Sequence, residues 1–371
     1  MSEKFITSDN KTCKTADKKT FKVVSNDGDI LTLEIGNQFS LKAGDSTSVT
    51  VKKIEKFDNI RQGTDTNALT KMSAKKGKGL TIDRITGDAT IKKGNFILSI
   101  PNYAQLAGLK TSTYQLLDAI TLAFTNSGAK NPTVILPLEE YMRRRGLKDR
   151  KEAKTQAKAD MDILKRASFS WEEKRDKTTQ SYAFVNLADS GEIKRNGSIV
   201  FTFGATFYNS LLGYNVMPYP AQLQTINNKK NPNSYYLLRK IAEHKNMNIG
   251  KKNENIISVK TLLDVAPSIP SYEEVTKTDR HFDRRIIEPF ERDMDALEDT
   301  LTWHFCHSLN QPLTEKELAT MSYEIFEKLL VHTIWKNYPD QTARLERKQE
   351  HLAQTKKKRK DTPKKKVNKE D

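Results

Sequence analysis

The segment "RHFDRRIIEPFERDMDAL" (280–297) combines an apolar seam, a proline and a cluster of cations. Its apolar residues recur every three or four positions, which predicts an amphipathic helix; they are Phe282, Ile286, Phe290, Met294 and Leu297. Pro289 lies inside this seam, where it removes a backbone donor and predicts a bend or a break. The first turns carry Arg280, His281, Arg284 and Arg285. The pattern indicates a helix that packs through one face and presents cations on the other.

The composition points to an anionic partner. The chain has 371 residues with 63 Lys and Arg against 47 Asp and Glu, a formal net charge of +16. Such a balance favours nucleic acid first and an anionic membrane surface second. No run approaches the roughly 18 apolar residues of a membrane helix, and the first residues lack the apolar core of a signal peptide. From Cys13 and Cys306, a single distant pair, neither a disulfide framework nor a zinc spacing can be read. We expect a cytoplasmic protein with no membrane partner and no cofactor.

Residues 99–215 predict a helix, a short strand, a helix, a long helix and then strands. The expected elements are 111–128, 132–136, 137–147, 149–167, 168–174, 181–189 and 198–203. The first helix has Thr and Ser at its start as caps. The long helix opens with Asp149 and Glu152, the spacing of a capping box. This order is that of a winged helix-turn-helix, whose long helix before the hairpin enters the DNA major groove.

The same order is predicted again in residues 216–310. A helix at 231–248 is followed by a strand and helix at 256–266, the long segment at 279–298 and a strand at 300–306. Trp171 and Trp303 each follow a long helix at a similar distance, so we expect them to be equivalent anchors on the two wing strands. The fold class is therefore α+β, with two tandem winged helix-turn-helix domains.

Three further regions flank these domains. Residues 1–98 alternate in polarity around turns and predict a β-rich N-terminal extension. Residues 311–343 predict a C-terminal helical segment. Residues 344–371 hold twelve Lys or Arg against five Asp or Glu without apolar periodicity, which predicts a disordered basic tail. The uncharged stretch 198–228 is expected to form a buried junction between the two domains.

The segment "FDRRIIEPFERDM" with the strand after it resembles the second recognition helix of replication initiators from iteron-containing plasmids. The helix "LLDAITLAF", the strand and helix "ILPLEEYM", the strand "GSIVFTF" and the helix "SYYLLRKIA" are similar to that family too, so the resemblance covers about residues 100–305. It implies a bacterial DNA-binding protein of plasmid or mobile-element replication. The implied partners are double-stranded DNA with direct repeats at an origin, a second copy in a homodimer, and the host helicase and polymerase.

Two sets of residues are candidates for DNA contact. On the second long helix, Arg280, His281, Arg284 and Arg285 lie off the apolar seam, and arginine can bridge guanine O6 and N7. On the first long helix, Arg150, Lys151, Lys154, Thr155 and Lys158 lie opposite the apolar stripe and suit phosphate contact. For both helices the alternative is a surface helix with solvated charges.

The sequence offers little for catalysis. The glycines and lysines of "AKKGKGLT" do not have the spacing of a phosphate-binding loop, which disfavours a helicase ATPase. The six histidines include no His-x-His pair of the kind that a rolling-circle nickase would use. His304 and Cys306 should lie on one face of a strand and His307 on the other, which disfavours a metal site. We therefore expect no enzyme activity. Two other functions stay open: an origin nickase or primase, and a transcriptional regulator with the same fold.

Overall fold

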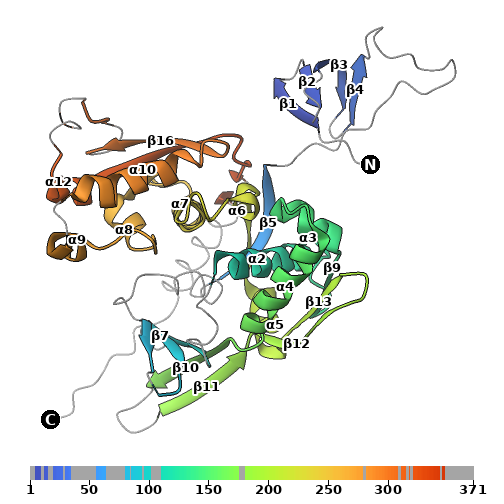
Figure 1. The fold of residues 1–371 in the computed structure, drawn as a ribbon. Helices are drawn as coiled ribbons and strands as arrows, with labels where there is room; N and C mark the ends of the chain where they lie inside the picture. Colours follow the sequence, from blue (N-terminus) through green and yellow to red (C-terminus); the bar gives the residue numbers. More distant parts are fainter. Residues whose placement is uncertain are drawn as a thin grey trace, which may run out of the picture. The chain divides into compact units, whose positions relative to one another are not determined.

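The structure is a computed structural model. It describes residues 5–9, 12–15, 20–27, 30–34, 56–63, 80–83, 85–93, 96–101, 110–174, 180–278, 281–307, 311–314, 317, 321–342 and 345–346. The chain divides into two compact units, Met1–Lys56 and Phe57–Asp371. In the first unit, β1 (Phe5–Asp9), β2 (Thr12–Thr15), β3 (Thr20–Asp27) and β4 (Ile30–Glu34) form an antiparallel four-stranded sheet, drawn in blue in Figure 1.

A winged helix begins at residue 111, as the order of elements predicts. Its elements are α2 (Thr111–Asn126), β9 (Thr133–Leu136), α3 (Leu138–Arg145), α4 (Arg150–Leu164), β12 (Ala188–Ile193) and β13 (Ile199–Phe203). The strands form an antiparallel sheet in the order β12-β13-β9. The long helix α4, which occupies the recognition-helix position of the motif, packs on α2 and α3 (Figure 1). Its inward face contains Ala153, Ala157 and Leu164, all buried. Small side chains at the first two positions let the neighbouring helices approach closely.

A second winged helix follows in the same order. It consists of α7 (Ser234–Asn248), β15 (Ile256–Ser258), α8 (Val259–Leu263), a long helix formed by η2 (Asp283–Ile287) and α10 (Glu288–Asp295), β16 (Leu301–Cys306) and β17 (Leu330–Trp335). The short helix α9 (Tyr272–Thr278) precedes the long one. The sheet order is β15-β17-β16, antiparallel throughout. The α+β class with two tandem winged helices is confirmed.

The hairpin that we predicted as the first wing lies in a different sheet. Strands β10 (Ser168–Lys174) and β11 (Gln180–Asn186) pair with β8 (Phe96–Ile100), β7 (Ala89–Lys93) and β6 (Leu80–Ile82) in the order β11-β10-β8-β7-β6. Trp171 is therefore opposite Phe96 and Ala183 in this sheet, whereas Trp303 is on β16 of the second winged helix. The predicted equivalence of the two tryptophans is wrong. Alternation of polarity identifies strands, but it does not identify their partners.

The C-terminal segment was also predicted incorrectly in part. Among its described residues, α12 (Tyr323–Lys328) is helical, but Leu330–Trp335 forms β17, the central strand of the second winged helix. The β-branched Val331 and Thr333 are both buried, two positions apart, as in a strand. The tail at 344–371 lies outside the described residues, apart from residues 345 and 346.

The predicted N-terminal extension is β-rich, but its strands belong to three sheets. Besides β1–β4 and β6–β8, β5 (Phe57–Gln62) pairs with β14 (Asn215–Pro220). Phe57 packs against Trp335 and Tyr338, with ring centroids 6.1 and 5.2 Å away. At the other face of the strand, Asp58 accepts a hydrogen bond of 2.6 Å from Arg144 at the end of α3. Strand β5 thus contacts both winged helices.

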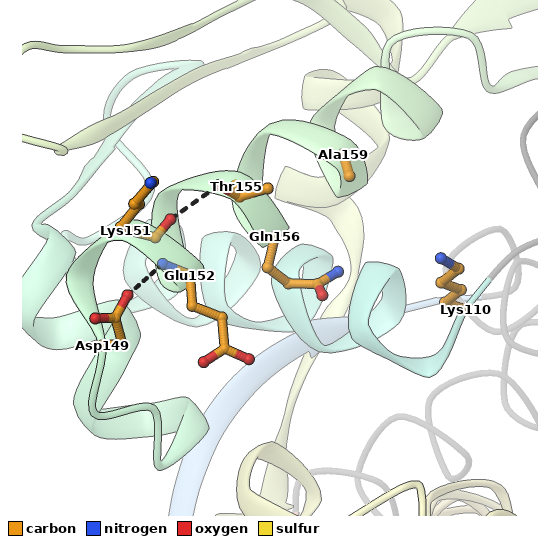
Figure 2. A pocket seen from close by; sticks show the side chains of 7 residues that line it. All are labelled: Lys110, Asp149, Lys151, Glu152, Thr155, Gln156 and Ala159. Carbon is orange, nitrogen blue, oxygen red and sulfur yellow. Dashed lines mark hydrogen bonds between the residues drawn. The ribbon is translucent and has the colours of Figure 1, made fainter.

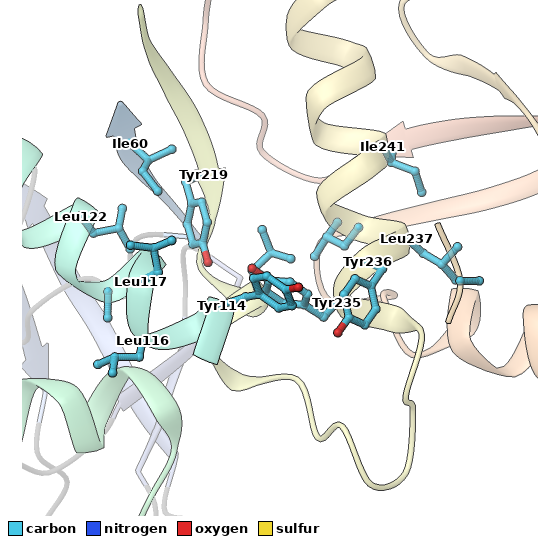
Figure 3. Close-up of a cluster of buried hydrophobic side chains, with 14 of the residues drawn as sticks. Ile60, Tyr114, Leu116, Leu117, Leu122, Tyr219, Tyr235, Tyr236, Leu237 and Ile241 are labelled. Carbon is cyan, nitrogen blue, oxygen red and sulfur yellow. The ribbon is translucent and has the colours of Figure 1, made fainter. Parts of the chain in front are cut away.

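The junction between the winged helices is buried and contains an ion pair. Tyr219 of the uncharged stretch 198–228 takes part in it, whereas Ile199–Phe203 of that stretch is strand β13 of the first winged helix. Asp118 on α2 accepts a hydrogen bond of 2.6 Å from Arg239 on α7, and both side chains are almost fully buried. The hydroxyls of Tyr235 and Tyr219 also donate to Asp118, at 2.7 and 2.8 Å. Figure 3 shows these two tyrosines with Tyr114 and Tyr236 between the apolar residues of the two domains. Burial by itself would lower the pKa of the Arg239 guanidinium, but Asp118 beside it raises that pKa above its usual range. The contact holds α7 against α2.

Candidate nucleic-acid interface

The long helix in the recognition-helix position of the second domain begins with a π-turn. Residues Asp283–Ile287 have π-helical geometry, and the N–H of Glu288 donates to the carbonyl of Asp283, five residues earlier. Regular α-helix starts at Glu288 with Pro289 in its first turn, where a missing N–H is tolerated. The bend or break predicted at Pro289 therefore takes the form of one wider turn before the proline.

The apolar seam of this helix is buried as the periodicity predicts. Ile286 and Phe290 are at most 1% exposed, and Met294 and Leu297 are fully buried. Phe290 lies within 6.1 Å of the rings of Trp303, Phe305 and Phe326. Phe282 is half-buried and packs against Tyr323. Helix, wing strand and α12 thus form a continuous core under the recognition helix.

The predicted basic residues gather at the start of this helix. His281, Arg284 and Arg285 are exposed, and Arg280 lies outside the described residues. Within the described part of the chain, neither Arg284 nor Arg285 forms an ion pair with a carboxylate. An arginine without such a partner can direct its planar fork of donors to a base or a phosphate. This turn has the chemistry that a base-reading surface requires.

The later turns of the same helix are acidic. Glu288, Glu291 and Asp295 follow the π-turn, and Arg292 pairs with the buried Asp293 at 2.8 Å. Burial raises the pKa of the Glu291 carboxyl, and the nearby charges of Asp295 and Glu288 raise it further. Anionic groups at these positions repel phosphates. Among the described residues of this helix, the exposed arginines without a carboxylate partner therefore lie before Glu288.

The first recognition helix holds its basic residues differently. Asp149 caps it by accepting a hydrogen bond of 2.6 Å from the Glu152 N–H, as predicted. Arg150 pairs with Glu139 and also donates to the Asn196 carbonyl at 3.3 Å. Lys154 donates to the Arg195 carbonyl at 3.0 Å. Two of the five candidates are thus bonded to the wing or to α3.

The other three candidates on this helix are exposed. Thr155 donates to the Lys151 carbonyl of its own helix at 2.9 Å, and Lys151 and Lys158 extend from the surface. A groove of about 400 Å³ lies beside Lys151 and Thr155, and Figure 2 shows the side chains that line it. It is lined by Lys110, Asp149, Lys151, Glu152, Thr155, Gln156 and Ala159. Two lysines and two carboxylates share this groove, so it is no purely cationic phosphate pocket.

The wing tip adds two cations that the sequence analysis did not select. Lys194 and Arg195 are exposed in the turn between β12 and β13. The N–H of Lys194 donates to the Ser198 carbonyl at 2.9 Å, and Gly197 has a φ of +92°, which favours glycine. The Asn196-Gly197 pair is a turn signal between two strands that could have located this hairpin.

Three consecutive arginines at the end of α3, Arg143, Arg144 and Arg145, form contacts within the protein. Arg143 and Arg144 both pair with Glu140 at 2.7 Å, and Arg144 also pairs with Asp58. Arg145 donates to the side chain of Gln115 and to the Gln224 carbonyl. These contacts join α3 to α2, β5 and the junction. Arg144 and Arg145 thus bond between elements of the protein, whereas the Arg143 side chain is 62% exposed beside Glu140 of its own helix.

Each of the two recognition helices carries its own buried aspartate. Asp160 on α4 accepts hydrogen bonds from the hydroxyls of Ser112 and Thr113 at 2.9 and 2.8 Å. These hydroxyls, predicted as helix caps, bond to Asp160 instead, and α2 has no side-chain cap. Asp293 on α10 accepts from the backbone and side-chain nitrogens of Asn233 at 2.9 and 2.7 Å. In each domain the aspartate anchors the recognition helix to the start of the first helix, where a carboxylate is favourable.

The histidines of the second sheet lie on neighbouring strands. His304 and His332 are directly opposite, with ring centroids 5.0 Å apart. Burial lowers the pKa of His332, and His304 lowers it further. Among the described residues, no group of three or more His, Cys, Asp or Glu side chains is arranged to hold a metal. Likewise, none of the helices in the described ranges has the length and apolar character needed to cross a membrane.

Comparisons with known proteins show limited likeness. No family model and no curated protein matches the sequence. A crystal structure of domains 2 and 3 of RctB matches 71% of this chain and 97% of its own, at 11% identity and a TM-score of 0.41. A second structure of RctB domains 2–3 matches 72% and 96%, at 10% identity and a TM-score of 0.37. The WH1 domain of MSBI1.176, a replication protein isolated from a multiple sclerosis patient, matches 32% and 85%, at 12% identity and a TM-score of 0.24.

Proposed function

We propose that this protein is a sequence-specific, non-enzymatic DNA-binding initiator of plasmid or mobile-element replication. The observation that carries the proposal is the exposed π-turn of the second recognition helix. There Arg284 and Arg285 lie at the start of a helix whose other face is buried. A recognition helix needs this combination, because its seam holds the orientation while its first turns reach base edges.

The first domain complements this surface by holding the DNA backbone. Four exposed cations lie on α4 and on the wing, which a hydrogen bond from Lys154 joins. They are Lys151, Lys158, Lys194 and Arg195. Such groups suit phosphates, which add affinity without sequence preference. Two domains fixed by a buried ion pair would place their helices on one duplex at a constant separation.

The wider role follows from the resemblance of the sequence to iteron-plasmid initiators. We propose that the protein binds direct repeats at an origin in the cytoplasm, helps to open the adjacent duplex, and recruits the host helicase and polymerase. A homodimer would limit initiation or regulate transcription. Neither a cofactor nor catalysis by the protein is part of this proposal.

The test begins with selection of duplexes from a random-sequence library by the full chain. We expect a defined preferred sequence, and an affinity for it roughly a thousandfold or more above that for random duplex. Log affinity should fall linearly with log salt for both. Equal affinity for selected and random duplexes would refute sequence-specific binding.

Replication itself needs a separate assay. A plasmid that carries the coding region and direct repeats of the selected sequence should replicate in a host that lacks another initiator for it. Support for transcription control without replication would identify a regulator. Nicking of supercoiled DNA by the purified protein with a divalent metal would identify a nickase.

A further inference from the structure

The spacing of the seam explains why the second recognition helix contains a π-turn. Phe282, Ile286 and Phe290 are four residues apart, and an α-helix turns about 100° per residue. Each four-residue step therefore overshoots a full turn by about 40°, so a continuous α-helix would rotate Phe282 by about 80° away from Phe290. One extra residue in a turn cancels about 100° of rotation, which returns Phe282 to within about 20° of the seam.

Pro289 favours the same geometry. In a continuous α-helix its ring would collide with the carbonyl of Arg285, four residues earlier. The structure switches from a four-residue to a five-residue hydrogen bond just before the proline: Arg285 N–H donates to the His281 carbonyl at 3.3 Å, whereas Glu288 N–H donates to Asp283. Seam spacing and proline thus select one wide turn at residues 283–287.

The wide turn determines where the two arginines lie. Ile286 remains buried while its neighbours Asp283, Arg284 and Arg285 are all exposed. Residues in the π-turn are rotated progressively relative to α10, by up to about 100° at its start. The directions of Arg284 and Arg285 relative to the rest of the domain therefore depend on the extra residue.

We propose that the π-turn, fixed by Pro289 and the four-residue seam, is the positioning device that sets the sequence preference of the second winged helix. It places two consecutive arginines on the DNA-facing surface while Phe282 and Ile286 stay in the core. This inference rests on the proposed DNA-binding function and goes beyond it, because it assigns specificity to the helix register. Pro289 is a positioning residue that does not itself contact DNA.

The decisive variant closes the wide turn without removing either arginine. Deletion of Asp283 together with Pro289→Ala leaves Phe282, Ile286 and Phe290 at spacings of three and four, which a continuous α-helix satisfies. We expect this variant to melt within a few degrees of the unmodified protein. Its affinity for the selected duplex should fall about tenfold or more, with an altered preference at the positions that the arginines read.

Asp283→Ala is the matched control, because it removes the same exposed side chain and keeps the register. It should retain both the melting temperature and the ranking of single-base variants of the selected duplex. Unchanged affinity and ranking in the deletion variant would overturn the inference, since the wide turn would then be irrelevant to reading.

Loss of folding in the deletion variant would also overturn it, because the π-turn would then be required for the core and not for arginine placement. Melting curves followed by circular dichroism distinguish these outcomes. If the unmodified protein ranks all duplexes equally, the proposed function fails and the inference fails with it. If the unmodified protein is selective but the deletion variant ranks duplexes identically, only the inference fails.

Discussion

The first recognition helix starts at the Asp149 side-chain cap and is bonded to its wing by Arg150 and Lys154, whereas the second starts in a π-turn with exposed arginines. Cations that are bonded to a carbonyl lose freedom to adapt to different bases, but they keep their charge. Arginines on an exposed turn keep their charge and can also adopt different side-chain conformations at different bases. We infer that the first domain contributes mainly affinity and the second mainly discrimination.

The largest effect is expected at the junction that holds the two domains together. Arg239→Met leaves Asp118 as an unpaired buried carboxylate and should lower the free energy of unfolding by about 3–5 kcal/mol. The double variant Asp118→Leu/Arg239→Met removes both charges but leaves the hydroxyls of Tyr219 and Tyr235 without their acceptor, so it should recover only part of that loss. Urea unfolding of the full chain measures both. A single variant as stable as the unmodified protein would show that the domains are oriented by other contacts.

The shared buried aspartates allow a direct comparison of the two domains. Asp160→Ala and Asp293→Ala each leave two or more buried donors without an acceptor, which should cost about 1–3 kcal/mol or more. Asp162→Ala, which removes an exposed partner of Lys165, is the control and should cost at most about 0.5 kcal/mol. Chemical denaturation checks all three. If Asp160→Ala and Asp293→Ala lose no more unfolding free energy than Asp162→Ala, the two buried aspartates do not have the equivalent structural role that we propose.

The division of labour predicts different binding defects in the two helices. Arg284→Ala and Arg285→Ala should each lose about 1–3 kcal/mol of specific binding, with relaxed preference at one position of the site. Lys151→Ala and Lys158→Ala should weaken binding to selected and random duplexes equally and lower the salt slope by about one each. Titrations at several salt concentrations give both quantities. If the lysine variants instead relaxed the sequence preference and the arginine variants weakened binding to all duplexes equally, the roles of the two domains would be the reverse of those we infer.

The smallest effect concerns pH. Burial raises the pKa of Asp160, although hydrogen bonds from Gln156, Thr113 and Ser112 oppose the rise. Because the folded state then holds the proton more tightly than the unfolded chain, this group stabilises the fold below its unfolded pKa of about 3.9, and the benefit is lost as pH rises through the folded value. The unfolding free energy of the unmodified protein minus that of Asp160→Asn should therefore increase as the pH falls from 7 to 4. A flat difference would contradict the raised pKa.

The order of elements could be predicted because each winged helix is built from local signals. Asp149 and Glu152 located one recognition helix, and the seam from Ile286 to Leu297 located the other. The pairing of strands could not be predicted in the same way. The strand of Trp171 pairs with β8, and β17 pairs with β15 and β16, all of which are distant in the sequence. The candidate cations were identified by charge alone, so the sequence could not separate Arg150, which pairs with Glu139, from the exposed Lys151. The π-turn was anticipated only as a disturbance at Pro289.

The place of β17 in the second sheet has a consequence for synthesis of the chain. It lies between β15 and β16, which do not pair with each other, yet it is the last of the three to be made. While the ribosome is still adding residues before Leu330, the edges of both earlier strands lack their neighbour, and Phe305 lacks its cover from Val331 and Phe326. Unpaired strand edges and exposed apolar surface favour aggregation. The first winged helix can close as soon as its own strands emerge, whereas the second waits for Leu330–Trp335, which follows α12, to complete the centre of its sheet.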